Sequence, residues 1–289
     1  MEKVLNLIRF PNLLLIALCQ VLVQICLLQP AIPVRQILVQ ESFFLLLFST
    51  FCVAAAGYII NDYYDIKIDA INKPKRLVVG KSINRRQAIL AHLLLTGIGI
   101  IVGVVINWRI GFINLGAALL LWGYSARFKK NLLIGNVVIS VLSATMLLVV
   151  AVNTGSDNKA VWAYALFAFV ISLIREIIKD MEDIKGDASF DCRTLPIVVG
   201  IPGSKWVLYA LLLLFYMIVM AAVVYRREDP FFGFYMLFFV LLPGAFMINL
   251  LIKADRRRDF SRLSRWCKGL MFMGILSMLL FRWYRISRV

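Results

Sequence analysis

The chain is poor in acidic residues, in histidine and in any long polar stretch. Aspartate and glutamate contribute only 16 of the 289 residues, and the single histidine is His92. The five cysteines form no CxxC pair and show no zinc-ligand spacing. No GxSxG, Walker-type or GxGxxG motif is present, so neither an esterase-type nucleophile nor a nucleotide-binding loop is indicated. Without a polar stretch long enough for a soluble domain, the chain is not expected to contain one.

Apolar residues are present in excess. They make up 62% of the chain, charged residues make up 17%, and the mean hydropathy is +0.85. Soluble domains average about 45–50% apolar and about 25% charged residues, so these values indicate a polytopic membrane protein. The formal net charge is +16, but the basic residues fall between apolar runs. That distribution is typical of membrane topology signals and argues against nucleic acid as a partner.

Apolar runs of about 20 residues predict nine transmembrane helices in one all-α domain, residues 1–289, around a central cavity. The first run follows Lys3 and Arg9 without a small-residue cleavage site, so we expect a retained span. When the N-terminus and the even-numbered connections share a side, most basic residues collect there, and the positive-inside rule makes that side cytoplasmic. The sequence predicts a multi-pass protein of the inner (cytoplasmic) membrane. The spans are expected near 11–29, 42–60, 88–106, 110–125, 133–152, 161–178, 206–225, 231–252 and 268–283.

Six of the 16 acidic residues form two triplets of identical spacing at the ends of spans. Both triplets lie on the predicted cytoplasmic side. Each is followed by Val-Val-Gly, at 78–80 and 198–200, before the next span. This echo predicts a parallel internal repeat in which spans two to five correspond to six to nine. The segment NDYYDIKID contains Asp62, Asp65 and Asp69, and KDMEDIKGD contains Asp180, Asp183 and Asp187.

The triplet spacing suits a metal site. On a continuous helix, positions i, i+3 and i+7 fall within roughly 60°, so three carboxylates line one face. Their mutual repulsion is offset when a hard cation such as Mg²⁺ binds. Mg²⁺ takes one or two protein carboxylates and completes its shell with water and phosphate oxygens. Two such faces could hold a diphosphate between magnesium ions, which makes all six aspartates candidate metal ligands and catalytic residues.

Basic and polar residues beside the triplets could bind the phosphate oxygens. NKPKR follows the first triplet, and YSARFKK forms the next cytoplasmic connection. Arginine can fork onto phosphate oxygens, and lysine acts as a point charge. The candidate substrate-binding residues are Asn61, Asn72, Lys73, Arg76, Tyr124, Lys129, Lys130 and Arg193.

These motifs resemble the paired aspartate-rich signature of the UbiA superfamily of membrane prenyltransferases. NDYYDIKID matches the family's NDxxDxxxD, and the second triplet matches DxxDxxxD. The resemblance covers essentially the whole chain and implies Mg²⁺-dependent transfer of a prenyl group from its diphosphate. REIIKDMEDIKGD and RTLPIVVG are most similar to the branch that makes digeranylgeranylglyceryl phosphate. That implies geranylgeranyl diphosphate as donor, the hydroxyl of geranylgeranylglyceryl phosphate as lipid-like acceptor, and ether lipid synthesis.

Other functions stay open. Homologues in the same superfamily prenylate aromatic acids in quinone synthesis. Carboxylates in a membrane also mark ion transporters, although transporters tend to place them near the midplane on broken helices. A CDP-alcohol phosphotransferase also uses clustered aspartates and Mg²⁺, but its DGxxAR element is absent. The sequence does not indicate an oligomeric state.

Overall fold

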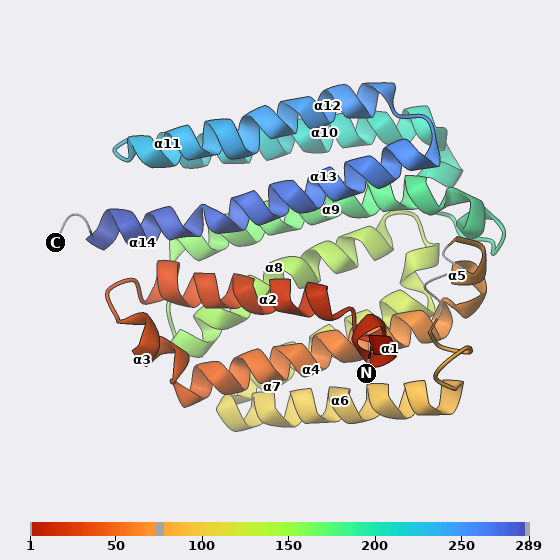
Figure 1. Cartoon of the computed structure of the whole chain (residues 1–289), viewed down its shortest axis with the longest axis horizontal. Helices are drawn as coiled ribbons and strands as arrows, with labels where there is room; N and C mark the ends of the chain where they lie inside the picture. The colour runs from red at the N-terminus through yellow and green to blue at the C-terminus, as the bar shows by residue number, and fades with distance from the viewer. Residues whose placement is uncertain (1, 73–77, 287–289) are drawn as a thin grey trace.

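The computed structural model describes residues 2–72 and 78–286, and within these ranges it is helical and contains no β-strand. The long helices lie side by side along one axis (Figure 1). Eight helical stretches within the described residues are long and apolar enough to cross a membrane. The predicted all-α, multi-pass membrane architecture is therefore confirmed. The eight stretches are Phe10–Leu28, Glu41–Tyr64, Arg85–Ile106, Ile134–Thr154, Lys159–Ala188, Leu195–Tyr225, Pro230–Lys253 and Arg257–Tyr284.

Several of these stretches are composites of shorter elements. The first combines α2 (Phe10–Leu22) with a π-helical segment, η1 (Val23–Leu28). The seventh combines α11 (Pro230–Met236), η4 (Leu237–Leu241) and α12 (Leu242–Lys253), and the eighth combines α13 (Arg257–Leu276) with α14 (Met278–Ile286). The uninterrupted helices are α4 (Glu41–Tyr64), α6 (Arg85–Ile106), α8 (Ile134–Thr154) and α9 (Lys159–Ala188). Helix α10 (Leu195–Tyr225) is kinked near its start, at Gly200. The short elements are α1 (Glu2–Leu7), α3 (Val34–Leu38), α5 (Ile66–Asn72) and η3 (Phe128–Lys130).

The predicted count of nine spans is not confirmed. The expected fourth span, near 110–125, is α7 (Trp108–Ala126), which is not among the eight helices that meet the length and composition criteria. Arg109 and Asn114 lower its apolar character. The helix nevertheless packs against α4 and α6, and Asn114 Nδ2 donates a hydrogen bond to the Gly99 carbonyl of α6 at 2.9 Å.

Helix α9 organises the bundle because it packs against α8, α10 and α13. Asn158 caps its start by accepting a hydrogen bond from the Ala160 amide at 2.8 Å. Four of its isoleucines, Ile171, Ile174, Ile177 and Ile178, are fully buried in the core. The helix then continues through the second triplet to Ala188. The expectation of three carboxylates on one continuous helical face is confirmed there.

The first triplet does not lie on a continuous helix, and that expectation was wrong. Helix α4 ends at Tyr64, and Asp65 (φ −87°, ψ 2°) separates it from α5. The Asp69 amide donates to the Asp65 carbonyl at 2.7 Å, which restarts the helix after the break. Helix α5 then packs against α9, so the break turns the chain towards the second triplet (Figure 1).

The two Val-Val-Gly segments adopt different structures. Val78–Gly80 belongs to a turn in which Val79 pairs with Ile83. The second segment, 198–200, lies in the first turns of α10, which begins at Leu195, before the start near residue 206 that was expected, and kinks at Gly200 (φ 73°, ψ 173°). Gly80 (φ 86°) and Gly200 (φ 73°) both hold left-handed backbone conformations that disfavour a side chain. The internal repeat stays a prediction.

Candidate active site

The two aspartate motifs lie at the same end of the bundle. The first occupies the last turn of α4 and the start of α5, and the second occupies the last turns of α9 (Figure 1). The packing of α5 against α9 joins these segments, which are more than 100 residues apart in the sequence. The fold therefore places both acidic motifs beside one another, as a site shared between them requires.

Basic side chains from other elements contact the first motif. The Arg9 guanidinium, between α1 and α2, donates from Nη2 to Asp62 Oδ1 at 2.7 Å. The Lys129 ammonium, in η3, makes an ion pair with Asp65. Both aspartates are largely shielded from solvent, with 15% and 14% of their side chains exposed. The N-terminal junction and the connection between α7 and α8 therefore hold the first motif in place.

The second motif is contacted from α8 and α13. Asn136 Nδ2 donates to Asp180 Oδ2 at 2.7 Å. Arg257 Nη2, at the start of α13, lies 3.9 Å from Asp183 Oδ1. Across both motifs, four of the six aspartates thus have a donor or cation from a different helix. Such contacts fix the direction in which a carboxylate points.

The two motifs share charged neighbours. Lys129 pairs with Asp65 and also interacts electrostatically with Asp187 and Lys179 of α9. Arg9 pairs with Asp62 and interacts with Lys179 in the same way. Two cations from outside the motifs are therefore paired with the first motif and influence charged residues of the second.

A second group of charges lies one turn earlier on α9. Glu176 is buried, accepts from Arg175 Nη1 at 2.5 Å, and lies 3.7 Å from Lys179 Nζ. Tyr124 of α7 interacts electrostatically with Glu176 and Asp180. This brings the predicted residue Tyr124 to the second motif.

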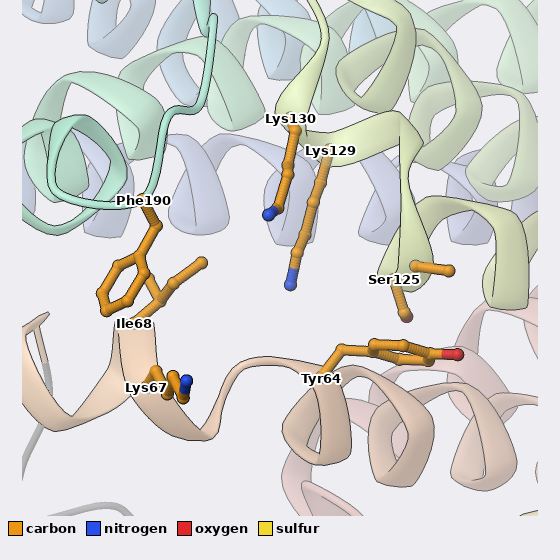
Figure 2. Close-up of a pocket in the computed structure, with 8 residues that line it drawn as sticks. Tyr64, Lys67, Ile68, Ser125, Lys129, Lys130 and Phe190 are labelled. Carbon is orange, nitrogen blue, oxygen red and sulfur yellow. The ribbon is translucent and has the colours of Figure 1, made fainter.

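A pocket of about 140 Å³ opens between the first motif and the connection after α7. Figure 2 shows Lys129 and Lys130 pointing from η3 towards the segment that joins α4 to α5, and Lys67 lies in the first turn of α5. Pockets for drug-sized ligands typically hold about 300–1,000 Å³, so this one suits a headgroup-sized anion rather than a whole lipid. Its lining residues are Tyr64, Lys67, Ile68, Ser125, Ala126, Lys129, Lys130 and Phe190.

Burial and neighbouring negative charges shift the pKa values of the site's cations in opposite directions. Burial lowers the pKa of Lys129 to about 8, while the negative charge of Asp187 acts in the opposite direction by favouring the charged ammonium. Burial also acts to lower the pKa of Arg9, but the attraction and hydrogen bond of Asp62 outweigh it and raise that pKa above its usual value. Burial raises the pKa of the Cys192 thiol, and Asp187 adds to the increase, so this cysteine is protonated and inert at neutral pH.

The remaining predicted residues contribute less to the described geometry. Arg193 is exposed, and it contributes its backbone amide, which donates to the Lys130 carbonyl at 2.7 Å. Asn61 lies half-buried in the last turn of α4, where its carbonyl accepts from the Asp65 amide at 3.0 Å. The side chain of Asn72 and the whole of Lys73 and Arg76 lie outside the described residues.

Three residues of the site were not predicted as binding residues. Arg9 and Arg257 looked like ordinary topology determinants, and nothing in the local sequence separates them from the other basic residues. Asn136 offered a signal, because it is a polar residue just inside an apolar span, where a buried amide needs a partner.

The carboxylates fit a shared Mg²⁺ site better than a closed metal cage. Among residues 2–72 and 78–286, no three histidine, cysteine, aspartate or glutamate side chains are grouped closely enough to hold a metal ion by themselves. Oxygen donors on two facing helices nevertheless match what Mg²⁺ needs when substrate phosphate supplies the rest of its shell. The six aspartates remain the candidate ligands.

A model of the UbiA prenyltransferase family matches residues 21–276. Among curated proteins, the digeranylgeranylglyceryl phosphate synthase of Pyrococcus horikoshii is 38% identical over 146 residues, which cover 50% of this chain and 52% of that protein. The protein of the same name from Methanopyrus kandleri is 39% identical over 148 residues, covering 51% and 54%. The matched region thus spans about half the length of these curated relatives.

Solved structures resemble the chain over nearly its whole length. A structure described for digeranylgeranylglyceryl phosphate synthase in membranes has a TM-score of 0.71 and 26% identity, covering 98% of this chain and 99% of that one. A UbiA homologue from Archaeoglobus fulgidus, bound to GPP and Mg²⁺, has a TM-score of 0.64 and 16% identity, covering 96% and 99%. The second likeness establishes the shared fold.

Proposed function

Because the chain belongs to the UbiA prenyltransferase family, we propose that it transfers a geranylgeranyl group from geranylgeranyl diphosphate to geranylgeranylglyceryl phosphate. The observation that carries this proposal is the packing of the two aspartate motifs from distant helices, with the Lys129 ammonium paired to Asp65 of the first motif. The names of the curated relatives and the solved structure similar over 98% of the chain support this choice of substrates.

The proposed reaction begins with binding of the donor diphosphate. When bound, Mg²⁺ would supply Lewis-acid neutralisation of the negative charge on that group. Lys129 and Lys130 bind diphosphate oxygens, together with Arg76, and stabilise the charge that grows as the allylic C–O bond breaks. The electron pair of that bond leaves with the diphosphate. Asn61 orients an aspartate or a phosphate oxygen.

The acceptor hydroxyl then captures the prenyl cation. Its oxygen forms the new C–O bond, and its proton passes to a carboxylate, for which the motif aspartates are the candidates. This proton transfer needs only a weak base, because the oxygen becomes acidic as it bonds to the cation. A catalytic histidine is therefore not required, and His92 is engaged elsewhere, with Nδ1 3.1 Å from the Ala56 carbonyl oxygen.

The site is assigned to the cytoplasmic face of the inner membrane. The distribution of lysine and arginine between the connections supports this orientation. Residues 1–289 are proposed to act as one transmembrane domain, with an internal repeat of spans two to five and six to nine. Its partners are a prenyl diphosphate, a lipid acceptor and membrane lipids.

The decisive experiment supplies purified protein with Mg²⁺ and geranylgeranyl diphosphate. Geranylgeranylglyceryl phosphate and 4-hydroxybenzoate are offered in parallel, and products are identified by mass spectrometry. We expect an ether lipid from the first acceptor only. A product from the aromatic acid alone would overturn the assignment in favour of quinone-type chemistry. If neither acceptor reacts and ions cross proteoliposomes containing the protein, the transporter alternative is supported instead.

A further inference from the structure

Arg9 occupies an unusual backbone conformation at the edge of the proposed site. It separates α1 from α2 with φ 51° and ψ 51°, one of three non-glycine residues with positive φ among the described residues. Residues with a side chain seldom adopt this left-handed region, and such strain is concentrated at functional positions. The strain is therefore a reason to ask what this turn achieves.

The turn directs the guanidinium into the first motif. Nη2 donates to Asp62 Oδ1 at 2.7 Å, and the guanidinium carbon lies 5.1 Å from the centre of the Tyr58 ring. Both partners are on α4, so the ring and the carboxylate hold the guanidinium from two sides. A third of the Arg9 side chain remains exposed, at 34%.

Arg9 also has charged and polar neighbours beyond α4. It interacts electrostatically with Asp69 of the first motif, with Tyr124 of α7 and with Lys179 of α9. Arg9 and Lys179 are close enough to repel each other, although Arg9 is paired with Asp62 and Lys179 lies 3.7 Å from Glu176. A group with two or more negative charges would be attracted to these cations.

We propose that Arg9 is a further anion-binding residue of this site, paired with Asp62 until a divalent cation takes that carboxylate and then bound to the diphosphate. This inference rests on the proposed function, because it assumes that Asp62 binds metal. A guanidinium has five N–H donors, so it can leave one carboxylate oxygen and fork onto a phosphate without moving its backbone.

The proposed exchange predicts opposite changes in two affinities, the affinity for the metal ion alone and the affinity for the metal–diphosphate complex. While Arg9 neutralises Asp62, a metal ion that binds alone must compete with it. Removing the guanidinium should therefore strengthen binding of the metal alone. The same change removes a cation from the diphosphate, so it should weaken binding of the metal–diphosphate complex. A residue that merely holds α1 against α4 would not shift the two affinities in opposite directions.

The test measures both affinities on the purified full-length protein. Mn²⁺ alone is titrated with detection by electron paramagnetic resonance, and inorganic pyrophosphate is titrated by calorimetry in saturating Mg²⁺. For Arg9→Gln we expect Mn²⁺ to bind several-fold more tightly and pyrophosphate to bind at least about tenfold more weakly, the scale of one lost hydrogen bond to a charged group. Arg86→Gln is the matched control, because Arg86 is an exposed arginine in the first turn of α6, and both affinities should stay unchanged.

The outcomes separate this inference from the proposed function. Unchanged affinities in Arg9→Gln, or a parallel loss of both, would overturn the role of Arg9 while leaving the prenyltransferase proposal intact. Failure of the unaltered protein to bind pyrophosphate with Mg²⁺ would count against both. If Arg9→Gln does not fold, Arg9→Lys undergoes the same titrations. Lysine keeps the positive charge but cannot donate two parallel hydrogen bonds to a phosphate, so pyrophosphate binding should weaken by a smaller factor. Unweakened binding would contradict the proposal.

Discussion

The ammonium of Lys129 lies against the carboxylate of Asp65, the residue at which α4 ends. Only 12% of the lysine side chain and 14% of the aspartate side chain are exposed. Solvent and salt therefore screen this pair less than a surface pair. The ion pair holds the segment between α7 and α8 against the first motif. It also places the Lys129 ammonium at the pocket of Figure 2.

Replacing Lys129 should weaken use of the prenyl diphosphate. Lys129→Gln removes the charge while retaining a polar side chain, and we expect KM for the diphosphate to rise at least about tenfold, the scale of one lost hydrogen bond to a charged group. Steady-state kinetics with varied donor measures this change. The control is Lys253→Gln, at the exposed end of α12. An unchanged KM together with an unchanged kcat would remove Lys129 from the diphosphate site.

The two motifs should each be indispensable. Asp65→Asn and Asp183→Asn retain the size of the side chain but lose the charge that would bind Mg²⁺. We expect each to lower kcat at least about 100-fold, the lower end of the range for loss of one transition-state electrostatic contact. Asp157→Asn is the control, because Asp157 precedes α9 and accepts a hydrogen bond from Trp162. Full activity in both motif variants, with folding intact, would refute a site shared between the motifs.

Asn136 should set the magnesium requirement. Its side chain is buried and orients Asp180 through a 2.7 Å hydrogen bond. Loss of a partner that orients a metal ligand typically costs 10–100-fold in metal affinity or activity. We therefore expect Asn136→Ala to need about tenfold more Mg²⁺ for half-maximal rate, with little loss of rate at saturating Mg²⁺. A magnesium titration of activity identical to that of the unaltered protein would show that the hydrogen bond has no such role.

The second motif could be predicted from the sequence more fully than the first. On α9 the spacing of Asp180, Asp183 and Asp187 coincides with a helix that runs through to Ala188, so periodicity was sufficient. The break at Asp65 could not be predicted from local sequence, because no proline or glycine lies beside it. It depends on the contact with Lys129 and on the packing of α5 against α9, and both are tertiary.

Long-range contacts also explain the other differences. Arg9 and Asp62 are 53 positions apart, so no local pattern relates them. Asn114 lowers the hydropathy of α7, yet its amide is satisfied by the Ser49 hydroxyl of α4 and the Gly99 carbonyl of α6. Hydropathy counts such a residue as polar, whereas the folded protein has already compensated its burial.

Removing the charge of Glu176 should destabilise the protein. Glu176 is 6% exposed at its side chain and faces the cations of Arg175 and Lys179. Glu176→Gln would leave the partly exposed cations of Arg175 and Lys179 without their buried carboxylate, and the cost should stay below the roughly 3–5 kcal/mol of a fully buried pair because water reaches both cations. We expect a lower Tm in detergent, followed by tryptophan fluorescence. Glu182→Gln on the same helix is the control, and an equal Tm in the two variants would show that the Glu176 ion pairs do not stabilise the fold.

Site-directed labelling should decide both the orientation of the chain and whether α7 crosses the membrane. The five native cysteines are buried and free, so an introduced exposed cysteine will dominate labelling. Asn107→Cys and Arg127→Cys flank α7, and both positions are exposed. In intact cells, a membrane-impermeant maleimide should label position 107, while position 127 should react only after permeabilisation.

Asp157→Cys and Asp191→Cys give the matching pair around α9, whose span is not in question. Position 157 should behave like position 107, and position 191 like position 127, because a cytoplasmic site requires the end of α9 to face inward. Equal accessibility of 107 and 127 would leave eight spans and show that α7 does not cross. Labelling of 127 and 191 from outside would instead place both aspartate motifs on the outer face and refute the orientation predicted from the basic residues.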